Sequence, residues 1–136
     1  MRSDQKNIKL NADNRELPAV TSTLAIWLIG NKWRLCIAKY LSQGKARFTD
    51  LKIGIPGISQ KVLTDNLRIM EAAGVVERTA YAEVPPRVEY ELTDIGNSGV
   101  PILDELKIWG EKYATYCHKH GIDIETVYSA SRKPRK

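Results

Sequence analysis

Residues 55–64 read Ile-Pro-Gly-Ile-Ser-Gln-Lys-Val-Leu-Thr, and this stretch holds a turn followed directly by the start of a helix. Pro56 and Gly57 both interrupt helical structure, so the chain is expected to turn there. Ser59 is a good N-cap residue, because its hydroxyl can accept a hydrogen bond from a free amide of the first helical turn. The stretch therefore predicts a helix over residues 59–73 that begins immediately after a tight turn.

Three helices are expected before this turn. Apolar residues recur at helical spacing over residues 21–29 and again over residues 31–42. Gly30 and Gly44 are placed to end these two helices, since glycine readily adopts the left-handed conformation that often follows a helix. A short third helix is expected to begin at Thr49 and to end before the turn.

Two strands are expected after the helix of residues 59–73, which Gly74 ends. Residues 75–81 and 87–93 have the composition of strands, and apolar and polar side chains alternate in the second of them. The connection 82–86 contains two prolines, which donate no amide hydrogen to a sheet. We therefore expect a two-stranded hairpin with this connection as its tip.

The part of the chain after the hairpin is helical again, with apolar residues at helical spacing over residues 102–116. Gly96, Gly99 and Pro101 are expected to make the first part of this helix irregular or kinked. The complete order of elements is that of a winged helix-turn-helix. The predicted fold class is therefore α+β and mostly helical, with additional helices at both ends of the domain.

Composition divides the chain into three regions. Residues 1–16 are polar and show no periodicity, which indicates a flexible N-terminal arm. Residues 17–120 are expected to form the winged helix-turn-helix domain together with its dimerisation helices. Residues 121–136 are expected to be a basic C-terminal tail. A chain of 136 residues is close to the commonest size of one domain.

Charge and cysteine content narrow the class of protein. The chain has 21 Lys and Arg against 16 Asp and Glu, and its net charge of +5 favours a polyanionic partner. No apolar run approaches the roughly 20 residues that span a bilayer, and the first residues contain no signal-peptide core. Cys36 and Cys117 are the only cysteines and do not make a disulfide framework. We expect a soluble, cytoplasmic protein with no membrane partner.

The helix of residues 59–73 has one apolar and one polar face. Leu63, Leu67 and Met70 fall at i, i+4 and i+7 and define a buried stripe. The opposite face suits DNA, because Gln can pair with adenine, Lys with guanine or phosphate, and Thr with either. The first turns of such a helix enter the major groove, where Ser59 and the free amides suit a phosphate. A merely solvated face is the alternative. The candidate DNA-binding residues here are Ser59, Gln60, Lys61, Thr64 and Arg68.

The hairpin carries further positive charge. Arg78 and Arg87 flank a tip stiffened by two prolines, so this wing could lie along the DNA backbone or enter the minor groove. Glu83 and Glu89 sit beside them, which leaves open an exposed hairpin of balanced charge. The candidate DNA-binding residues outside the helix of residues 59–73 are Arg78, Arg87, Lys45 and Arg47, of which the last two could equally be simple surface residues.

Short stretches distributed over most of the chain carry a family resemblance. The most specific are residues 55–64 and the Val-Pro-Pro-Arg-Val-Glu-Tyr of residues 84–90. Gly-Asn-Lys-Trp-Arg at residues 30–34 and Arg-Phe-Thr-Asp-Leu at residues 47–51 continue the pattern. Together they resemble the HxlR-type winged helix-turn-helix regulators of the MarR-like superfamily, over about residues 17–112.

The resemblance implies a homodimeric DNA-binding protein that regulates transcription, with the terminal helices forming the dimer. A two-fold dimer would space two recognition helices by one DNA turn, about 34 Å. Apolar stripes near both ends exceed what a small winged-helix core needs, and the candidate dimer residues are Leu24, Trp27, Leu28, Leu106, Trp109 and Tyr113.

The predicted function is sequence-specific binding of a double-stranded DNA operator by a transcription regulator, which we expect to be a repressor. Residues 59–73 would lie in the major groove, and residues 75–93 on the backbone or in the minor groove. A winged-helix module that contacts protein or RNA is the alternative, since the fold does not determine the function. The sequence identifies no effector ligand.

The cysteines of this chain differ from those of many HxlR-type relatives. Those relatives place a cysteine directly before a proline at the start of the first helix, and some use it to sense oxidants. This chain has Leu17-Pro18 there, so the thiol sensor is not carried over. Cys36 shares a helix with the apolar residues Trp33 and Tyr40 and is expected to be a small buried hydrophobic residue.

No metal site, cofactor or catalytic activity is expected. Cys117, His118 and His120 are too close together on one helix to converge easily on a zinc ion, which wants about four suitably spaced ligands. The sequence also lacks a glycine-rich phosphate loop, an HExxH motif, a nucleophile elbow and an evident carboxylate pair. We therefore predict that the protein is not an enzyme.

Overall fold

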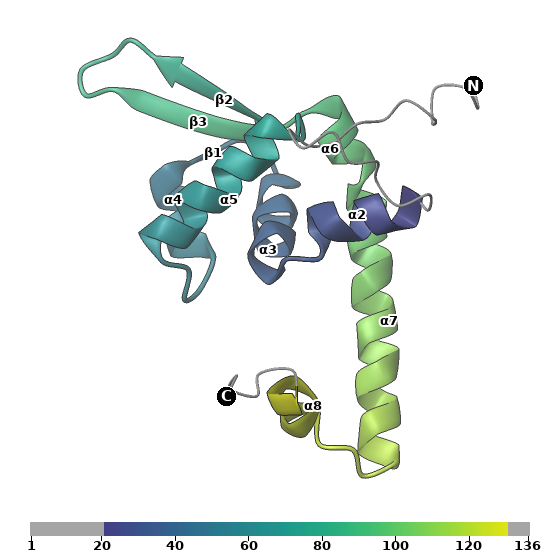
Figure 1. Ribbon diagram of the computed structural model, residues 1–136. Helices are drawn as coiled ribbons and strands as arrows, with labels where there is room; N and C mark the ends of the chain where they lie inside the picture. The colour runs from purple at the N-terminus through teal and green to yellow at the C-terminus, as the bar shows by residue number, and fades with distance from the viewer. Residues whose placement is uncertain (1–20, 131–136) are drawn as a thin grey trace, which may run out of the picture. The chain divides into compact units, whose positions relative to one another are not determined.

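The computed structural model describes residues 21–130 (Figure 1). The chain divides into two compact units, one that ends at Asn97 and one that starts at Ser98. The elements are, in chain order, α2 (Thr21–Ile29), α3 (Lys32–Leu41), β1 (Ala46–Arg47), α4 (Phe48–Gly54), α5 (Gln60–Ala72), β2 (Val76–Tyr81), β3 (Arg87–Leu92), α6 (Asp94–Ser98), α7 (Val100–Lys119) and α8 (Ile124–Ala130).

The turn before α5 forms as the sequence predicts. Gly57 has a φ of 81°, a left-handed conformation that glycine adopts without the steric cost of a Cβ. Ser59 is the N-cap residue, and its Oγ accepts a hydrogen bond of 3.1 Å from the amide of Val62. At the other end Gly74, with a φ of 78°, follows the last turn of α5. The predicted helix of residues 59–73 is therefore confirmed to within one residue at each end.

The break between α2 and α3 also has a local cause. A Cβ on Gly30 would collide with the carbonyl oxygen of Ile26, so only glycine fits this close approach. Asn31 caps the next helix, since its Oδ1 accepts hydrogen bonds from the amides of Trp33 (2.9 Å) and Arg34 (3.2 Å). The predicted end of one helix and start of the next are confirmed.

A three-stranded antiparallel sheet has the order β1–β3–β2. The hairpin of β2 and β3 is confirmed, and it extends beyond α4 and α5 as a wing (Figure 1). Strand β1 was not predicted, because two residues are too few to show any alternation. It exists because Ala46 and Arg47 pair with Tyr90 and Glu89 of β3.

The core of the first unit lies between α3, α4, α5 and the inner face of the sheet. Ile55 and Ile58, on either side of the turn, are 3% and 1% exposed, so burial of both side chains holds the turn against the helices. The other buried apolar residues of this unit are Ile37, Leu41, Ala46, Leu51, Leu63, Leu67, Met70, Val76, Tyr90 and Leu92.

In the second unit the long helix α7 is preceded by a break. The irregularity that the sequence predicted here is a break between the short helix α6 and α7, with Gly99 as the N-cap residue of α7. Pro101 lies in the first turn of α7, where its missing amide costs no hydrogen bond. Helix α8 lies within residues 121–136, where the sequence did not predict a helix. None of the helices within residues 21–130 is long and apolar enough to cross a membrane.

Candidate nucleic-acid interface

One face of α5 is polar and open to solvent. Ser59, Gln60, Lys61 and Arg68 are exposed and Thr64 is half-buried, while Leu63, Leu67 and Met70 on the opposite side are buried. This division follows from helical spacing, because residues three and four apart share a face. The structure therefore brings together all the DNA-binding candidates that the sequence placed on this helix.

Two of these side chains already have partners within α5. The Nζ of Lys61 lies 2.6 Å from an Oδ2 of Asp65, and both side chains are well exposed, at 84% and 47%. Such a pair stabilises a helix by only about 0.5 kcal/mol or less, so a stronger partner can displace it. The Thr64 hydroxyl donates to the Gln60 carbonyl (2.8 Å), which leaves the hydroxyl oxygen available as an acceptor.

A buried polar contact links α5 to α3 and to the end of α2. Asn66 is 6% exposed, its Nδ2 donates to the Val62 carbonyl (2.8 Å), and its Oδ1 accepts from Nη1 of Arg34 (3.0 Å). The remaining nitrogens of Arg34 donate to the carbonyls of Leu28 (2.7 Å) and Trp27 (3.0 Å). One guanidinium therefore satisfies two of the free carbonyls at the end of α2 and also holds α5.

Neither Arg34 nor Asn66 was identified from the sequence. Asn66 falls within the apolar stripe of α5, three residues after Leu63 and four before Met70. A polar residue at a core position requires a hydrogen-bonding partner, and that was the available signal. Its partner could not be inferred, because Arg34 is 32 residues away in sequence.

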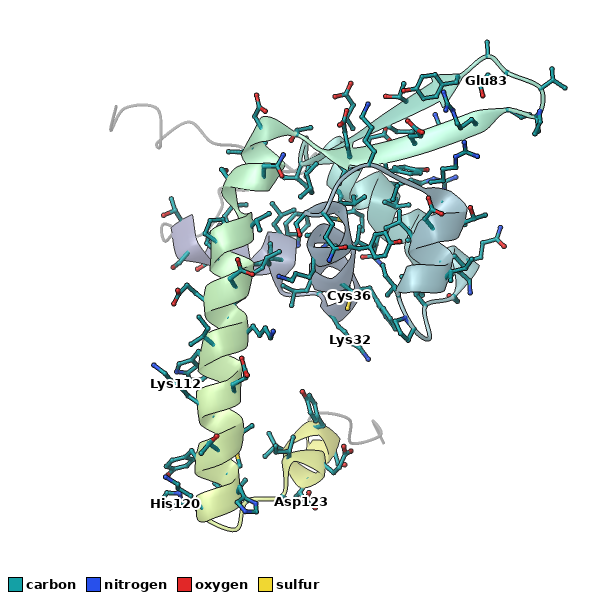
Figure 2. All side chains as sticks on the ribbon, turned by 180° about the vertical axis from the view of Figure 1, so that it is seen from behind. Lys32, Cys36, Glu83, Lys112, His120 and Asp123 are labelled. Carbon is teal, nitrogen blue, oxygen red and sulfur yellow. The ribbon has the colours of Figure 1, made fainter. Side chains whose placement is uncertain are left out.

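Arg87 does not lie free at the tip of the wing. Its Nη2 lies 3.1 Å from an Oε1 of Glu83, and its Nη1 lies 3.7 Å from an Oε2 of Glu89. Its Cζ lies 4.0 Å from the ring centroid of Tyr81, and its side chain is only 27% exposed. Figure 2 shows Glu83 near the far end of the hairpin. The guanidinium is thus held by acidic and aromatic neighbours on the wing itself.

Arg78 faces α5, in contrast to Arg87. It pairs with Tyr90 in the register of β2 and β3, so both side chains lie on the inner face of the sheet. A groove of about 350 Å³ opens between this face and α5. It is lined by Thr64, Leu67, Arg68, Glu71, Arg78 and Tyr90. Three of the predicted DNA-binding residues, Thr64, Arg68 and Arg78, therefore share one groove.

Lys45 and Arg47 are exposed at the edge of the sheet. Lys45 lies in a shallow hollow with Glu89 and Glu91, and Arg47 pairs with Glu89 across the strands. The Arg47 amide also donates to Asp50 Oδ2 (2.9 Å), which fixes the start of α4. These two cations therefore lie beside the acidic residues of β3 and do not line the groove.

The candidate dimer residues lie on exposed apolar faces. On α2, Trp27 is 62% exposed, while Leu24 and Leu28 are half-buried. On α7, Leu106, Trp109 and Tyr113 are all exposed. The rings of Trp109 and Tyr113 stack with centroids 5.8 Å apart. The aromatic face continues through Tyr116 to His120, which is labelled near the end of α7 in Figure 2.

The two cysteines differ in accessibility. Cys36 on α3 is half-buried, so it is less buried than the sequence predicted. Cys117 is completely buried. A side-chain hydrogen bond to Cys117 raises the pKa of Tyr113 above its usual value. Leu17-Pro18, where many HxlR-type relatives have a cysteine before the proline, lies outside the described residues.

The segment from Cys117 to His120 makes contacts other than metal ligation. The Nδ1 of His120 lies 2.9 Å from the Tyr116 carbonyl oxygen, and the two rings stack with centroids 4.0 Å apart. Within residues 21–130, no three His, Cys, Asp or Glu side chains come together where they could hold a metal ion.

Helix α5 follows a tight turn after α4, and a projecting hairpin follows α5. This arrangement defines a winged helix-turn-helix protein.

Residues 28–118 match the family described as HxlR-like helix-turn-helix. An HTH-type transcriptional regulator of Methanothermobacter thermautotrophicus (strain Delta H) is 44% identical over 98 residues, 72% of this chain and 75% of that protein. The HTH-type transcriptional regulator YdeP of Bacillus subtilis (strain 168) is 41% identical over 113 residues, 83% of this chain and 87% of that protein.

Solved structures agree with this assignment. The redox regulator HypR in its reduced form matches with a TM-score of 0.69 at 36% identity, over 74% of this chain and 99% of HypR. A structure from Enterococcus faecalis V583 assigned to the MarR family matches with a TM-score of 0.64 at 41% identity, over 73% of this chain and 90% of that chain. The chain belongs to the HxlR-like helix-turn-helix family. It is a transcriptional regulator with a helix-turn-helix domain, and not an enzyme.

Proposed function

We propose that this regulator binds a double-stranded DNA operator as a homodimer and represses transcription there. Helix α5, about residues 59–73, lies in the major groove, and the wing, about residues 75–93, contacts the backbone or the minor groove. The observation that carries the proposal is the exposed polar face of α5, directly after its capped N-terminus. Because the partner is chromosomal DNA, we expect the protein to act in the cytoplasm.

Gln60, Lys61 and Thr64 are the proposed base contacts. Gln60 and Lys61 are exposed in the first turn of α5, the part of a recognition helix that reaches deepest into the groove. The Gln60 amide can pair with adenine, and Lys61 can donate to guanine after leaving Asp65. Thr64 can accept a hydrogen bond from a base amino group. Ser59 and the free amides beside it suit a flanking phosphate.

The apolar faces of α2 and α7 support the homodimer. Exposure of large aromatic side chains such as Trp27 and Trp109 to water is unfavourable in free energy. A two-fold interface would bury these side chains in both subunits. Palindromic operators follow from such symmetry, since each subunit would read one half-site. Bound across a promoter, a dimer of this kind would block access of polymerase, which is why we expect repression.

Genome-wide mapping of bound DNA, with a strain that lacks the protein as reference, would identify the operator. Binding of the wild type, Gln60→Ala and Lys61→Ala is then measured on operator and scrambled duplexes. Loss of one base contact should cost about 1–3 kcal/mol on the operator and relax preference at one position per half-site. Lys107→Ala, which removes one positive charge from α7, serves as the matched control.

The alternative, a module for protein or RNA contact, predicts a different result. In that case Gln60→Ala and Lys61→Ala would keep any discrimination between duplexes while circular dichroism shows an intact fold. The polar character of α5 disfavours a protein partner, because protein interfaces concentrate apolar and aromatic side chains at their centre.

A further inference from the structure

The groove between α5 and the wing contains two arginines, Arg68 and Arg78, that make no ion pair with any residue of the described range 21–130. Among residues 21–130 the carboxylate pairs of the DNA-binding candidates involve Lys61 and Arg87. No such pair engages Arg68 or Arg78, although both line the same groove. Glu71 also lines it, so the groove carries two positive charges against one negative charge.

The fold places the two guanidinium groups on opposite walls. Arg68 follows Thr64 by one turn on α5, so it belongs to the same exposed face as the proposed base contacts. Arg78 lies two residues after the buried Val76 on β2, which puts it on the inner face of the sheet where the hairpin leaves the core. Tyr90, its cross-strand partner, is 9% exposed and closes the groove between them.

We propose that this groove binds one phosphate of the DNA backbone, with Arg68 and Arg78 donating to it from two sides. The proposal rests on the proposed function, because α5 in the major groove would bring the phosphates at the edge of that groove toward its own flank. A guanidinium fork matches the oxygens of a phosphodiester and remains charged at all physiological pH values.

The groove also accounts for which cations bind the backbone. Arg87 would have to leave Glu83, Glu89 and the Tyr81 ring before it could contact a phosphate. The free energy lost with these contacts would offset much of the free energy gained from the phosphate. Arg68 and Arg78 have no such pair to break among the residues that the structure describes. Of the two wing arginines that the sequence indicated, Arg78 at the base of the wing is therefore the one to which we assign the phosphate contact.

The test uses the full-length protein with fluorescently labelled operator and scrambled duplexes at several KCl concentrations. Arg68→Ala and Arg78→Ala should each weaken binding to both duplexes about tenfold at low salt, and each should reduce the salt slope by part of the roughly 0.9 per subunit that one phosphate contact contributes. Because both groups hold the same phosphate, the double variant should lose less than the product of the two single effects. Lys107→Ala, with the same change in net charge, should leave the slope unchanged.

Two further variants sharpen the test. Glu71→Gln removes the negative charge that Glu71 contributes to the groove lining and should tighten binding to both duplexes about threefold. Arg78→Lys keeps the charge but not the planar fork, so it should retain most of the salt slope and recover only part of the affinity. Arg68 and Arg78 are exposed, and circular dichroism should show native folds for all variants.

The outcomes separate this inference from the proposed function. Unchanged salt slopes in both arginine variants, with the wild type still preferring its operator, would overturn the phosphate groove alone. A wild type that binds operator and scrambled duplexes equally well would contradict the proposed function. The phosphate site would still be tested in that case, by comparing the salt slopes of the wild type and the two arginine variants on the scrambled duplex. Saturable binding of inorganic phosphate to DNA-free wild type, lost in Arg78→Ala while the DNA slope is unchanged, would show a free-anion site and overturn the backbone assignment.

Discussion

Removal of the buried amide of Asn66 should destabilise the first unit. Asn66→Ala deletes the bond from Nη1 of Arg34 (3.0 Å) and the bond to the Val62 carbonyl (2.8 Å). A hydrogen bond to a charged group contributes about 1.5–3 kcal/mol and a neutral one about 1 kcal/mol. The better helix propensity of Ala returns about 0.6 kcal/mol, and solvent reaching the half-buried Arg34 offsets part of the loss. We expect a net loss of about 2 kcal/mol and a Tm lower by roughly 6–10 °C.

Guanidinium unfolding at fixed protein concentration, followed by circular dichroism, measures this loss. A double-mutant cycle with Arg34→Ala isolates the bond itself, with an expected coupling free energy of about 1–2 kcal/mol. Lys61→Ala is the control, since its exposed pair with Asp65 should change stability by about 0.5 kcal/mol or less. A loss of under about 0.5 kcal/mol in Asn66→Ala, or a coupling free energy near zero, would refute the reasoning.

Three other outcomes are expected. Trp109→Glu places a charge on the exposed aromatic face of α7, and sedimentation should show a shift from dimer to monomer. If the wild type also sediments as a monomer in the presence of DNA, the homodimer is contradicted. Cys36→Ser combined with Cys117→Ala should leave any oxidant response of DNA binding unchanged in a folded protein, because the chain has Leu17 where relatives place the sensing cysteine and because Cys117 is fully buried; a lost response would show a thiol switch. Gly74→Ala should cost about 1 kcal/mol in denaturant unfolding because of its φ of 78°, whereas Gly110→Ala, with open space around its Cβ, should be neutral or stabilising.

Local chemistry made much of the fold predictable. The turn at Pro56 and Gly57, the cap at Ser59 and the stop at Gly74 each depend on residues within a few positions, so the limits of α5 could be inferred closely. The two prolines of the wing tip and the alternation in β3 predicted the hairpin in the same way. Family resemblance and the polar face of α5 then indicated a DNA-binding regulator.

The candidate site was predictable only in part, for the same reason. The face of α5 follows from helical periodicity, so Gln60 and Lys61 were identified correctly as exposed. Whether a cation is paired depends on side chains that the fold brings near it. The sequence predicted that Arg78 and Arg87 of the wing contact the DNA backbone or the minor groove, and only the structure places Glu83, Glu89 and Tyr81 around Arg87.

What the sequence by itself determined is therefore most of the elements, the limits of α5 and the class of protein, because capping, turn chemistry and periodicity act over short stretches of chain. The tertiary structure alone decided that β1 completes the sheet, that Asn66 meets Arg34, and that Arg68 and Arg78 share a groove. Each of these depends on contacts between residues distant in sequence, and no local pattern specifies which distant side chains will meet.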